Sequence, residues 1–426
     1  MQATSPSPIS YRGTRRACYA GFMTQAAINN LAPLLFVVFQ EEFGLSYERL
    51  GTLVLFNFCT QLIVDVLCAR FAHKIGYRVP MVAAHVFCVL GLVLLGVLPM
   101  LLSDAFVGLC VAAIVYAIGG GITDVLISPL IDSLPTPQNA KAASMALGHS
   151  FYCWGTLLVV LLSTLLLSWI DRSLWWILPL AWCALPLANA LAFARVPLTD
   201  MISDERRTKP RTLLARPAFC AMLLLMVCAG ASELTVAQWA SLYAEQALGL
   251  PKMWGDLLLP CLFALAMGVG RLLYGLLGHK INLRGFMLFC GALCVVCYLA
   301  LCLAPSPAVG VVACALIGFS VSIFWPGTCS LTSGRFSMGG ASMFAILAAF
   351  GHMGCAAGPW LAGLVTDRAD RGLFGRINGA LFQSLDGSPL RTGILIGVIF
   401  PLVLLAVLLV QRNQKQEGRE TGAQKG

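Results

Sequence analysis

Long apolar stretches, separated by short polar segments, run through almost the whole chain. Twelve can be counted, and each is long enough to cross a bilayer core as a helix, which needs about 20 apolar residues. Charged or turn-forming residues such as Asp171-Arg172 and Pro305-Ser306-Pro307 mark the breaks. The pattern therefore predicts membrane-spanning helices over approximately 17–39, 50–70, 79–101, 105–130, 143–169, 174–195, 217–244, 255–277, 285–304, 308–330, 341–365 and 393–411.

The longest interior polar segment lies between the sixth and seventh apolar stretches and contains Asp204-Glu205-Arg206-Arg207. It separates two sets of six predicted helices. We therefore expect an all-α membrane protein with two pseudo-symmetric bundles. The expected parts are an N-terminal bundle over 1–195, a cytoplasmic linker over 196–216, a C-terminal bundle over 217–411 and a cytoplasmic tail over 412–426.

The composition supports a membrane protein and excludes several other classes. Of the 426 residues, 59% are hydrophobic and 11% are charged, whereas soluble domains carry about 25% charged residues. A soluble enzyme, a disordered chain and a coiled coil are thus excluded. The 17 cysteines are scattered through apolar runs, where a free thiol acts as a small hydrophobe. No nearby histidine accompanies the closest pair, Cys294 and Cys297, so we expect no metal site.

The positive charges predict an orientation and do not indicate a nucleic-acid partner. The formal net charge is +9, with 28 Lys and Arg residues in total. If both termini are cytoplasmic, 20 of these residues lie in inner segments and 7 in outer segments. Cytoplasmic loops of membrane proteins carry such an excess of Lys and Arg. We therefore expect a multi-pass protein of the cell membrane with both termini in the cytoplasm.

An internal repeat links the two halves. The loop after the second predicted helix contains His73-Lys74-Ile75 and Arg78, and the same spacing recurs 206 residues later as His279-Lys280-Ile281 and Arg284. A second echo pairs Ala143-Ser144-Met145 with Ala341-Ser342-Met343. Equivalent positions in both halves indicate a duplication, and parallel six-helix repeats with a substrate site at the bilayer midplane are a known transporter architecture.

These loops carry a resemblance to the major facilitator superfamily of transporters. That family places a G-x-L-x-D-R-x-G-R-R signature after the second helix and a weaker copy after the eighth. The first loop keeps the basic residues of the signature as Lys74 and Arg78 and its glycine as Gly76. His73 takes the position of the family aspartate. The second copy keeps Gly275, Leu277, Lys280 and Arg284, again with a histidine, His279, at the aspartate position.

Within the superfamily, three segments resemble the branch of fucose and glucose symporters that are coupled to protons. The segments are Gly230-Ala231-Ser232-Glu233 with Trp239, Gly119-Gly120-Gly121 leading to Asp124, and His149-Ser150-Phe151 with Trp154. The resemblance implies a sugar substrate and transport coupled to protons.

Ionisable residues inside the predicted helices are functional candidates, because a charge at the bilayer centre costs at least about 2.5–3.5 kcal/mol on insertion scales. Glu233 is the first candidate for proton coupling: it lies near the middle of its helix among small residues, and burial favours the protonated form of a carboxyl group. The alternative is a carboxylate held by Arg271. Asp124 is the second candidate, with a locking contact to a neighbouring helix as the alternative. His85 and His352 are interpreted as structural.

Polar and aromatic side chains in the predicted helices form a candidate binding site for a polyhydroxy solute. Amide side chains hydrogen-bond hydroxyl groups, although they also hold helices together. His149 shares a helix face with Tyr152 and Thr156. Tryptophan faces stack on the apolar faces of sugar rings, with core packing as the alternative. The candidates are Asn29, Asn30, His149, Gln238, Trp239 and Trp325.

A cytoplasmic gate is the third predicted feature. Asp65 lies near the inner end of the second helix, close in sequence to the basic loop that follows it. We expect it to belong to a cytoplasmic gate network that also includes that loop and its repeat after the eighth helix. The predicted gate residues are Asp65, His73, Lys74, Arg78, His279, Lys280 and Arg284.

Together these features predict a secondary active transporter that moves a small polar solute, with a sugar favoured, by alternating access coupled to protons. A proton-coupled exporter of drugs or metabolites is the alternative. The chain has no G-x-x-x-x-G-K-[ST] loop for ATP and no H-E-x-x-H or G-x-S-x-G motif. We therefore expect neither an enzyme nor a cofactor. The expected partners are the solute, protons and the lipid bilayer, with the protein acting as a monomer.

Overall fold

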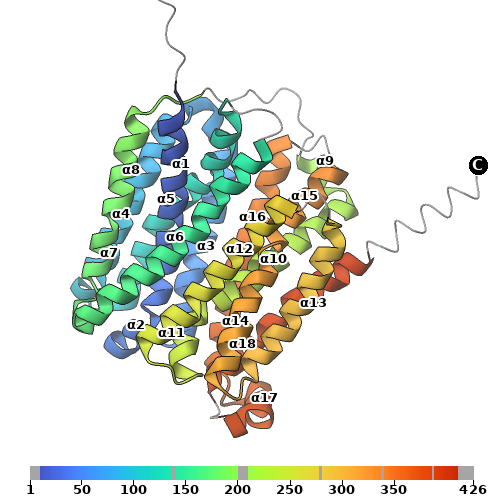
Figure 1. Ribbon diagram of the computed structural model, residues 1–426. Coiled ribbons are helices and arrows are strands. Elements are labelled where there is room, and N and C mark those ends of the chain that lie inside the picture. The colour runs from blue at the N-terminus through green and yellow to red at the C-terminus, as the bar shows by residue number, and fades with distance from the viewer. Residues whose placement is uncertain are drawn as a thin grey trace, which may run out of the picture.

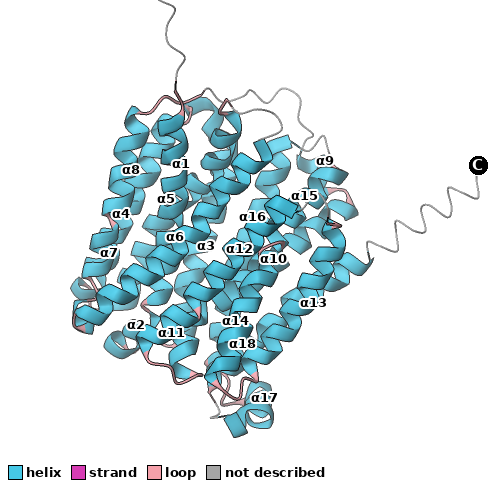
Figure 2. Cartoon of the chain, in the orientation of Figure 1, coloured by secondary structure: helices cyan, strands magenta, loops and turns pink. Residues whose placement is uncertain are grey.

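The computed structural model describes residues 10–135, 141–199, 210–277, 281–336, 340–385 and 388–410. These residues are almost entirely helical and contain no β-strand (Figure 2). Among the described residues, eleven spans are long and apolar enough to cross a membrane; some are single helices and others are two consecutive helices. The bent pair α1–α2 forms a twelfth span. The expectation of an all-α membrane protein with twelve spans is therefore confirmed.

The spans form two six-helix bundles that lie side by side (Figure 1). We call the face at which α1 begins the terminal face, and the face at which α3 begins the opposite face. The first bundle consists of α1 (Arg12–Leu34), α2 (Phe36–Phe43), α3 (Tyr47–Ile75), α4 (Arg78–Leu101), α5 (Ala105–Ser133), α6 (Lys141–Trp169), η2 (Arg172–Leu174), α7 (Ile177–Trp182) and α8 (Ala184–Arg195).

The second bundle follows the short helix α9 (Pro210–Leu214). Its tenth span is the consecutive pair α14–α15, and its last span starts with α18. Its elements are α10 (Pro217–Gln246), α11 (Lys252–Leu258), α12 (Pro260–Leu277), α13 (Leu283–Cys302), α14 (Pro307–Val321), α15 (Phe324–Arg335), α16 (Gly340–Thr366), α17 (Gly372–Phe382), η4 (Gln383–Leu385), α18 (Pro389–Leu395) and η5 (Ile396–Val398), after which the helix continues to Val410.

The first span is broken, and its sequence explains the break. Pro33 lies in the last turn of α1; proline donates no backbone hydrogen bond, and its ring crowds the preceding turn. α2 then continues at an angle of 42°. It ends at Gly44, whose φ of 62° lies in the left-handed region that favours glycine.

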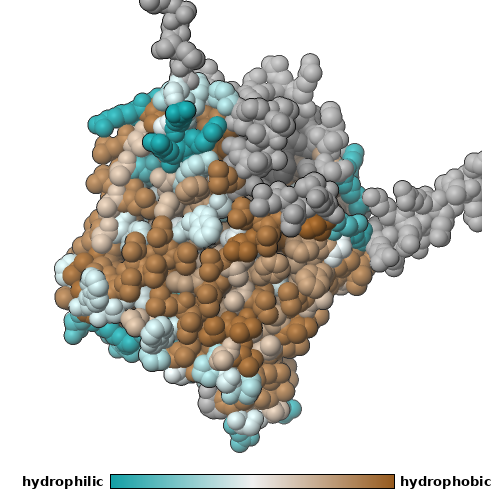
Figure 3. All heavy atoms as spheres, viewed as in Figure 1, coloured by the Kyte–Doolittle hydropathy of each residue, from teal (hydrophilic) through white to brown (hydrophobic). Residues whose placement is uncertain are grey.

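A broad apolar belt surrounds the bundles. Large apolar side chains point outward from many spans, among them Leu101, Val79 and Val296, which are 73%, 63% and 62% exposed. In Figure 3 the apolar atoms form a continuous zone, and the most polar atoms gather beyond it. Lipid is the solvent in which so much exposed apolar surface is stable, so the belt identifies the part of the protein that lies in the bilayer.

Small residues allow the closest helix contacts. A Cβ atom added to Gly119 of α5 would overlap the Ala84 carbonyl of α4, and one added to Gly354 of α16 would overlap the Val227 carbonyl of α10. Close backbone approach of this kind is a main source of helix association in membranes, where apolar side chains gain little by leaving lipid.

Two helix pairs make the most extensive contacts between the bundles. α3 packs on α16, and α6 packs on α12. Gly363 of α16 lies directly against the Tyr47 carbonyl at the start of α3. Any separation of the bundles must therefore change these two interfaces.

The described cysteines are all free thiols. Most are buried in the helix bundles, as the sequence predicts, and Cys220 is the exposed one among those described.

The packing predicts opposite effects for two glycine-to-alanine changes. Gly354→Ala places a methyl group against backbone and is expected to destabilise the fold by about 1–3 kcal/mol, the usual cost of overpacking. Gly379 of α17 has open space around it, so Gly379→Ala is expected to keep or raise stability through the higher helix propensity of alanine. The check is the temperature at which half of the detergent-solubilised protein leaves its monodisperse gel-filtration peak. Equal temperatures for the two variants would contradict the assigned close contact.

Candidate functional site

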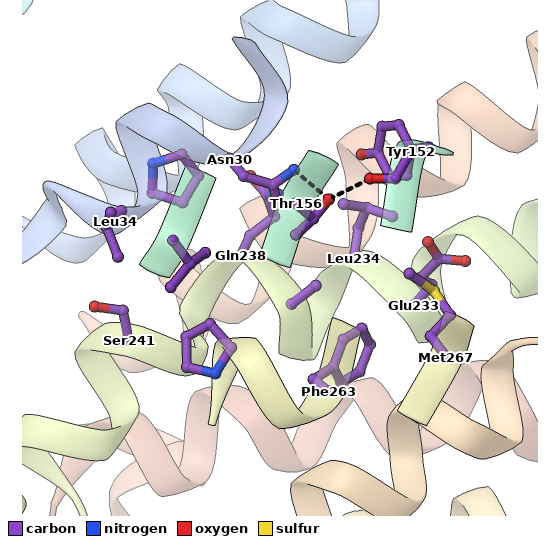
Figure 4. A pocket seen from close by; sticks show the side chains of 14 residues that line it. Asn30, Leu34, Tyr152, Thr156, Glu233, Leu234, Gln238, Ser241, Phe263 and Met267 are labelled. Carbon is purple, nitrogen blue, oxygen red and sulfur yellow. Dashed lines mark hydrogen bonds between the residues drawn. The ribbon is translucent and has the colours of Figure 1, made fainter. Parts of the chain in front are cut away.

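A small cavity lined by both polar and apolar groups lies between the bundles, among α1, α6, α10 and α12. Its volume is about 30 Å³, which is enough for water but too small for a sugar. Apolar residues such as Phe263 and Met267 form one wall (Figure 4). The polar groups that line it come from both bundles, and they are Asn30, Tyr152, Thr156, Glu233, Gln238 and Ser241.

The amide groups of the first bundle are held in place by one another. Asn29 Oδ1 accepts hydrogen bonds from Asn57 Nδ2 at 3.1 Å and Gln61 Nε2 at 2.8 Å. The neighbouring Asn30 donates to the Ala26 carbonyl at 2.8 Å and to Thr156 Oγ1 at 3.3 Å. The two amides therefore face different surroundings: Asn30 lines the cavity, whereas Asn29 belongs to a buried network.

Gln238 connects this network to the second bundle. Its side chain lines the cavity, and its Nε2 donates to the Asn29 backbone carbonyl at 3.2 Å. The contact joins α10 to α1 close to the centre of the molecule.

Glu233 lies at the edge of the cavity and forms an ion pair. Arg271 Nη2 of α12 lies 3.4 Å from Glu233 Oε2, and Arg271 Nη1 donates to Cys153 Sγ of α6 at 3.4 Å. Arg271 therefore links three helices from the two bundles. The partner that the sequence suggested as the alternative for Glu233 is present.

Asp124 does not lie beside Glu233 but belongs to a second buried cluster. His352 of α16 lies between two carboxylates: its Nδ1 is 2.6 Å from Asp65 Oδ2, and its Nε2 is 3.5 Å from Asp124 Oδ2. Asp65 and His352 are 1% and 5% exposed. Both carboxylates belong to the first bundle and the imidazole to the second, so the cluster bridges the two bundles.

The other aromatic and histidine candidates lie outside the cavity lining. His149 is 3.2 Å from Ser128 Oγ and packs against Phe22, while Tyr152 and Thr156 from the same face reach the cavity. Trp239 is fully buried and donates to the Pro359 carbonyl at 3.0 Å. Its ring therefore packs in the core and presents no face to this cavity.

Trp325 contributes to the second cluster instead. Its ring centroid lies 5.9 Å from that of His352. Gly351 leaves the space that this indole fills. The ring thus shields the imidazole from water and restricts its orientation.

The predicted gate residues have diverse positions. Arg78 donates to the carbonyls at the end of α8, including Phe193 at 3.0 Å and Val196 at 2.9 Å, and Arg284 donates to the Leu408 carbonyl. Asp65 faces His352. The side chains of His73 and Lys74, and His279 and Lys280 as a whole, lie outside the described residues.

Contacts across the opposite face close the space between the bundles there. Asp367, just after α16, accepts hydrogen bonds from the first two backbone amides of α3, those of Tyr47 at 3.1 Å and Glu48 at 2.7 Å. One bundle thus supplies the N-terminal cap of a helix in the other. Gln246 adds hydrogen bonds to Tyr47 and to Gln40.

A buried ion pair reinforces this closure. Lys252 Nζ lies 2.7 Å from Asp256 Oδ2 and donates to the Leu34 carbonyl at 3.0 Å, while Asp256 accepts from Thr164 at 3.0 Å. Lys252, Asp256 and Asp367 are not among the site residues predicted from the sequence. The i,i+4 spacing of Lys252 and Asp256 was the available signal; nothing local distinguishes Asp367.

The two bundles and the polar cavity between them define a polytopic transporter fold. The chain belongs to the Major Facilitator Superfamily, whose family model matches residues 17–359 and 257–426. No curated protein matches the chain.

Solved structures of transporters share this fold at low sequence identity. A bacterial homologue of the human lysosomal transporter Spinster, in an inward-facing and occupied conformation, is 15% identical with a TM-score of 0.73, over 96% of this chain and 98% of that one. A D-xylose–proton symporter is also 15% identical with a TM-score of 0.73, over 93% and 97%. Likeness at this identity shows the fold.

The cap from Asp367 gives a direct test of the closure. Asp367→Ala is expected to weaken the closed arrangement by about 0.5–2 kcal/mol, the usual range for a lost cap. The opposite face then opens more often, by about tenfold for 1.4 kcal/mol. The measurement is the rate at which a membrane-impermeant maleimide labels Ala237→Cys, which lines the cavity, in a Cys220→Ser background.

The matched control is Asp370→Ala, because Asp370 is exposed and pairs only locally with Arg371 among the described residues. This variant is expected to label at the parental rate. Equal rates in the two variants would show that Asp367 does not hold the face closed.

Proposed function

We propose that the protein is a secondary active transporter of the cell membrane that works by alternating access. Two bundles joined by a linker, with a polar cavity between them, support this mechanism. We place the bundle boundaries at 1–195 and 217–411, with 196–216 as the linker and 412–426 as the tail. The terminal face is taken as cytoplasmic on the basis of its excess of Lys and Arg, and the protein as a monomer.

A small polar solute, with a sugar favoured, is the proposed substrate. The supporting observation is the lining of the cavity, where amides and hydroxyls from Asn30, Thr156, Gln238 and Ser241 lie beside an apolar wall. Sugars present hydroxyls on their edges and C–H groups on their faces, so such a lining is complementary to them. Because the cavity is smaller than a sugar, binding requires the bundles to separate on one side.

Protons are the proposed coupling ion, with Glu233 and Asp124 as the candidate carboxylates. Both lie within spans where an unpaired charge is costly. Asp124 faces His352 across the bundle interface, and Glu233 pairs within its own bundle with Arg271, which in turn donates to Cys153 of the first bundle. A change in protonation at either residue alters a charge pair that touches the interface between the bundles. This is the observation that carries the proposal.

The alternative is a proton-coupled exporter of drugs or metabolites. The solved structures that share the fold include a homologue of a lysosomal transporter as well as a D-xylose–proton symporter. The abundance of hydrogen-bonding groups around the cavity favours a polar solute over an apolar drug.

Direction and substrate class can be tested together in proteoliposomes. An inward proton gradient is expected to drive accumulation of at least one member of a panel of labelled sugars, and an uncoupler is expected to abolish it. If the gradient drives only efflux, the exporter is the correct function. If no sugar responds in either direction, the proposed substrate class is wrong.

Glu233 is expected to be essential for accumulation. Glu233→Gln keeps the size of the side chain but removes the charge that faces Arg271. Loss of a hydrogen bond to a charged group costs about 1.5–3 kcal/mol, so accumulation should fall at least about tenfold. Glu42→Gln, which changes an exposed carboxylate at the end of α2, is the matched control. Parental uptake by Glu233→Gln would remove Glu233 from the transport site.

A further inference from the structure

The two groups of charged side chains within the spans, the Glu233–Arg271 pair and the Asp65–Asp124–His352 cluster, differ in net charge. Glu233 and Arg271 carry one negative and one positive charge, so this pair is neutral when both groups are ionised. The second cluster has two carboxylates, Asp65 and Asp124, and one imidazole, His352. Even with His352 protonated, one negative charge is left uncompensated, and both carboxylates pair with that same imidazole among the described residues.

The geometry shows a place for one further positive charge. Asp65 is 1% exposed, and its buried Oδ1 has no hydrogen-bond partner among the described residues, while Oδ2 is occupied by His352. A buried carboxylate oxygen without a donor is costly. The side chain of Asp124 is 22% exposed, so the cluster has one sealed end and one end that is partly accessible.

A proton suits this place better than a metal ion. One ligand atom from each of the three side chains lies within 4.8 Å of the others. However, the imidazole itself lies between the two carboxylates and bonds to Asp65 at 2.6 Å. Hard cations require a cage of several oxygens, and the ring occupies the position where such a cage would close.

The cluster also lies where it can influence the opening of one face. Asp65 and Asp124 are nearer to the terminal ends of α3 and α5 than to their opposite ends. His352 reaches them from α16, which packs along α3. An attraction between this imidazolium and the two carboxylates thus pulls the bundles together on the terminal side of the cavity.

We propose that Asp65, Asp124 and His352 hold the coupling proton as one unit and act as the latch on the terminal side. The proposal rests on the proposed proton-coupled function. With the proton bound, one carboxyl is neutral and the imidazolium has a single ionised partner. The cluster is then neutral overall, and the latch is weak.

Release of the proton to the terminal side regenerates two carboxylates around one imidazolium. The attraction across α3 and α16 then increases, which favours closure on that side and return to the form that is open on the opposite side. Proton binding and bundle movement are linked because they involve the same three groups.

Other titratable groups face the cluster from the helices packed around it. Cys355 lies one turn along α16, and His149 of α6 lies near Asp124 and bonds to Ser128. Glu233 and Arg271 lie farther toward the cavity as a balanced pair. Phe58 and Trp325 cover the imidazole with apolar rings.

Infrared difference spectroscopy of the reconstituted protein tests this assignment without any substrate. Spectra recorded between acidic and alkaline pH are expected to contain a carbonyl band from a buried protonated carboxyl group. Asp65→Asn and Asp124→Asn are each expected to remove or strongly shift this band. Glu233→Gln is expected to leave the band unchanged, because this carboxylate has its own cation, and Glu42→Gln, at an exposed position, is the matched control.

His352→Gln provides a second variant that keeps a hydrogen-bonding side chain at this position. Without the imidazolium, the two carboxylates have no cation, so the band is expected to persist to a more alkaline pH than in the parent. If Glu233→Gln removes the band while Asp65→Asn and Asp124→Asn preserve it, the proton belongs to Glu233 and the proposal is wrong. A band unaffected by any of these variants also overturns it.

The result is independent of the transported solute. If no sugar is transported but the band behaves as expected, the proton site stands and the proposed substrate is wrong. If sugar uptake depends on protons but the band does not involve these residues, the transporter stands and the coupling site lies elsewhere.

Discussion

The cost of a charge in hydrocarbon is the constraint on which the interior of this protein depends. An ionised side chain within a span must find an opposite charge or several hydrogen bonds, since the bilayer supplies neither. Here Arg271 of the same bundle pairs with Glu233, whereas His352 of one bundle lies between Asp65 and Asp124 of the other. At the Asp65–Asp124–His352 cluster, charge pairing and bundle association are therefore the same interactions. A change of charge in that cluster also changes how firmly the bundles are joined.

Close packing stabilises the second bundle, whereas polar contacts join the two bundles at the opposite face. Glycines allow α10 and α16 to touch at the backbone, which makes the second bundle a firm unit. At the opposite face, Asp367 caps α3, and Lys252 reaches the Leu34 carbonyl. These contacts lie at helix ends, where backbone groups need partners in any case. In the proposed alternating-access mechanism, movement of whole bundles exchanges such partners while the packed interior of each bundle is kept.

The spans are predictable from the sequence, because a helix that crosses lipid must carry a long apolar run. Glu233, Asp124, Asn30 and Gln238 are recognisable as candidates, because polar residues are conspicuous in such runs. The link between Asp65 and His352, which are 287 positions apart, is not predictable, because no local periodicity encodes a contact between bundles. Trp239 was expected at the substrate site, but its ring lies in the core. The sequence of one chain does not distinguish a tryptophan that faces a cavity from one that packs in the core.

In the proposed mechanism, protonation controls which face of the protein opens. Spin-label distances at both faces test it most directly. One protein carries labels on Cys220 and Ala194→Cys for the terminal face, and another, with Cys220→Ser, carries labels on Glu42→Cys and Trp254→Cys for the opposite face. Acidification should lengthen the terminal-face distance without lengthening the opposite one, and Asp65→Asn should produce the longer distance already at neutral pH. Distances that ignore pH, or that lengthen together at both faces, would contradict this account.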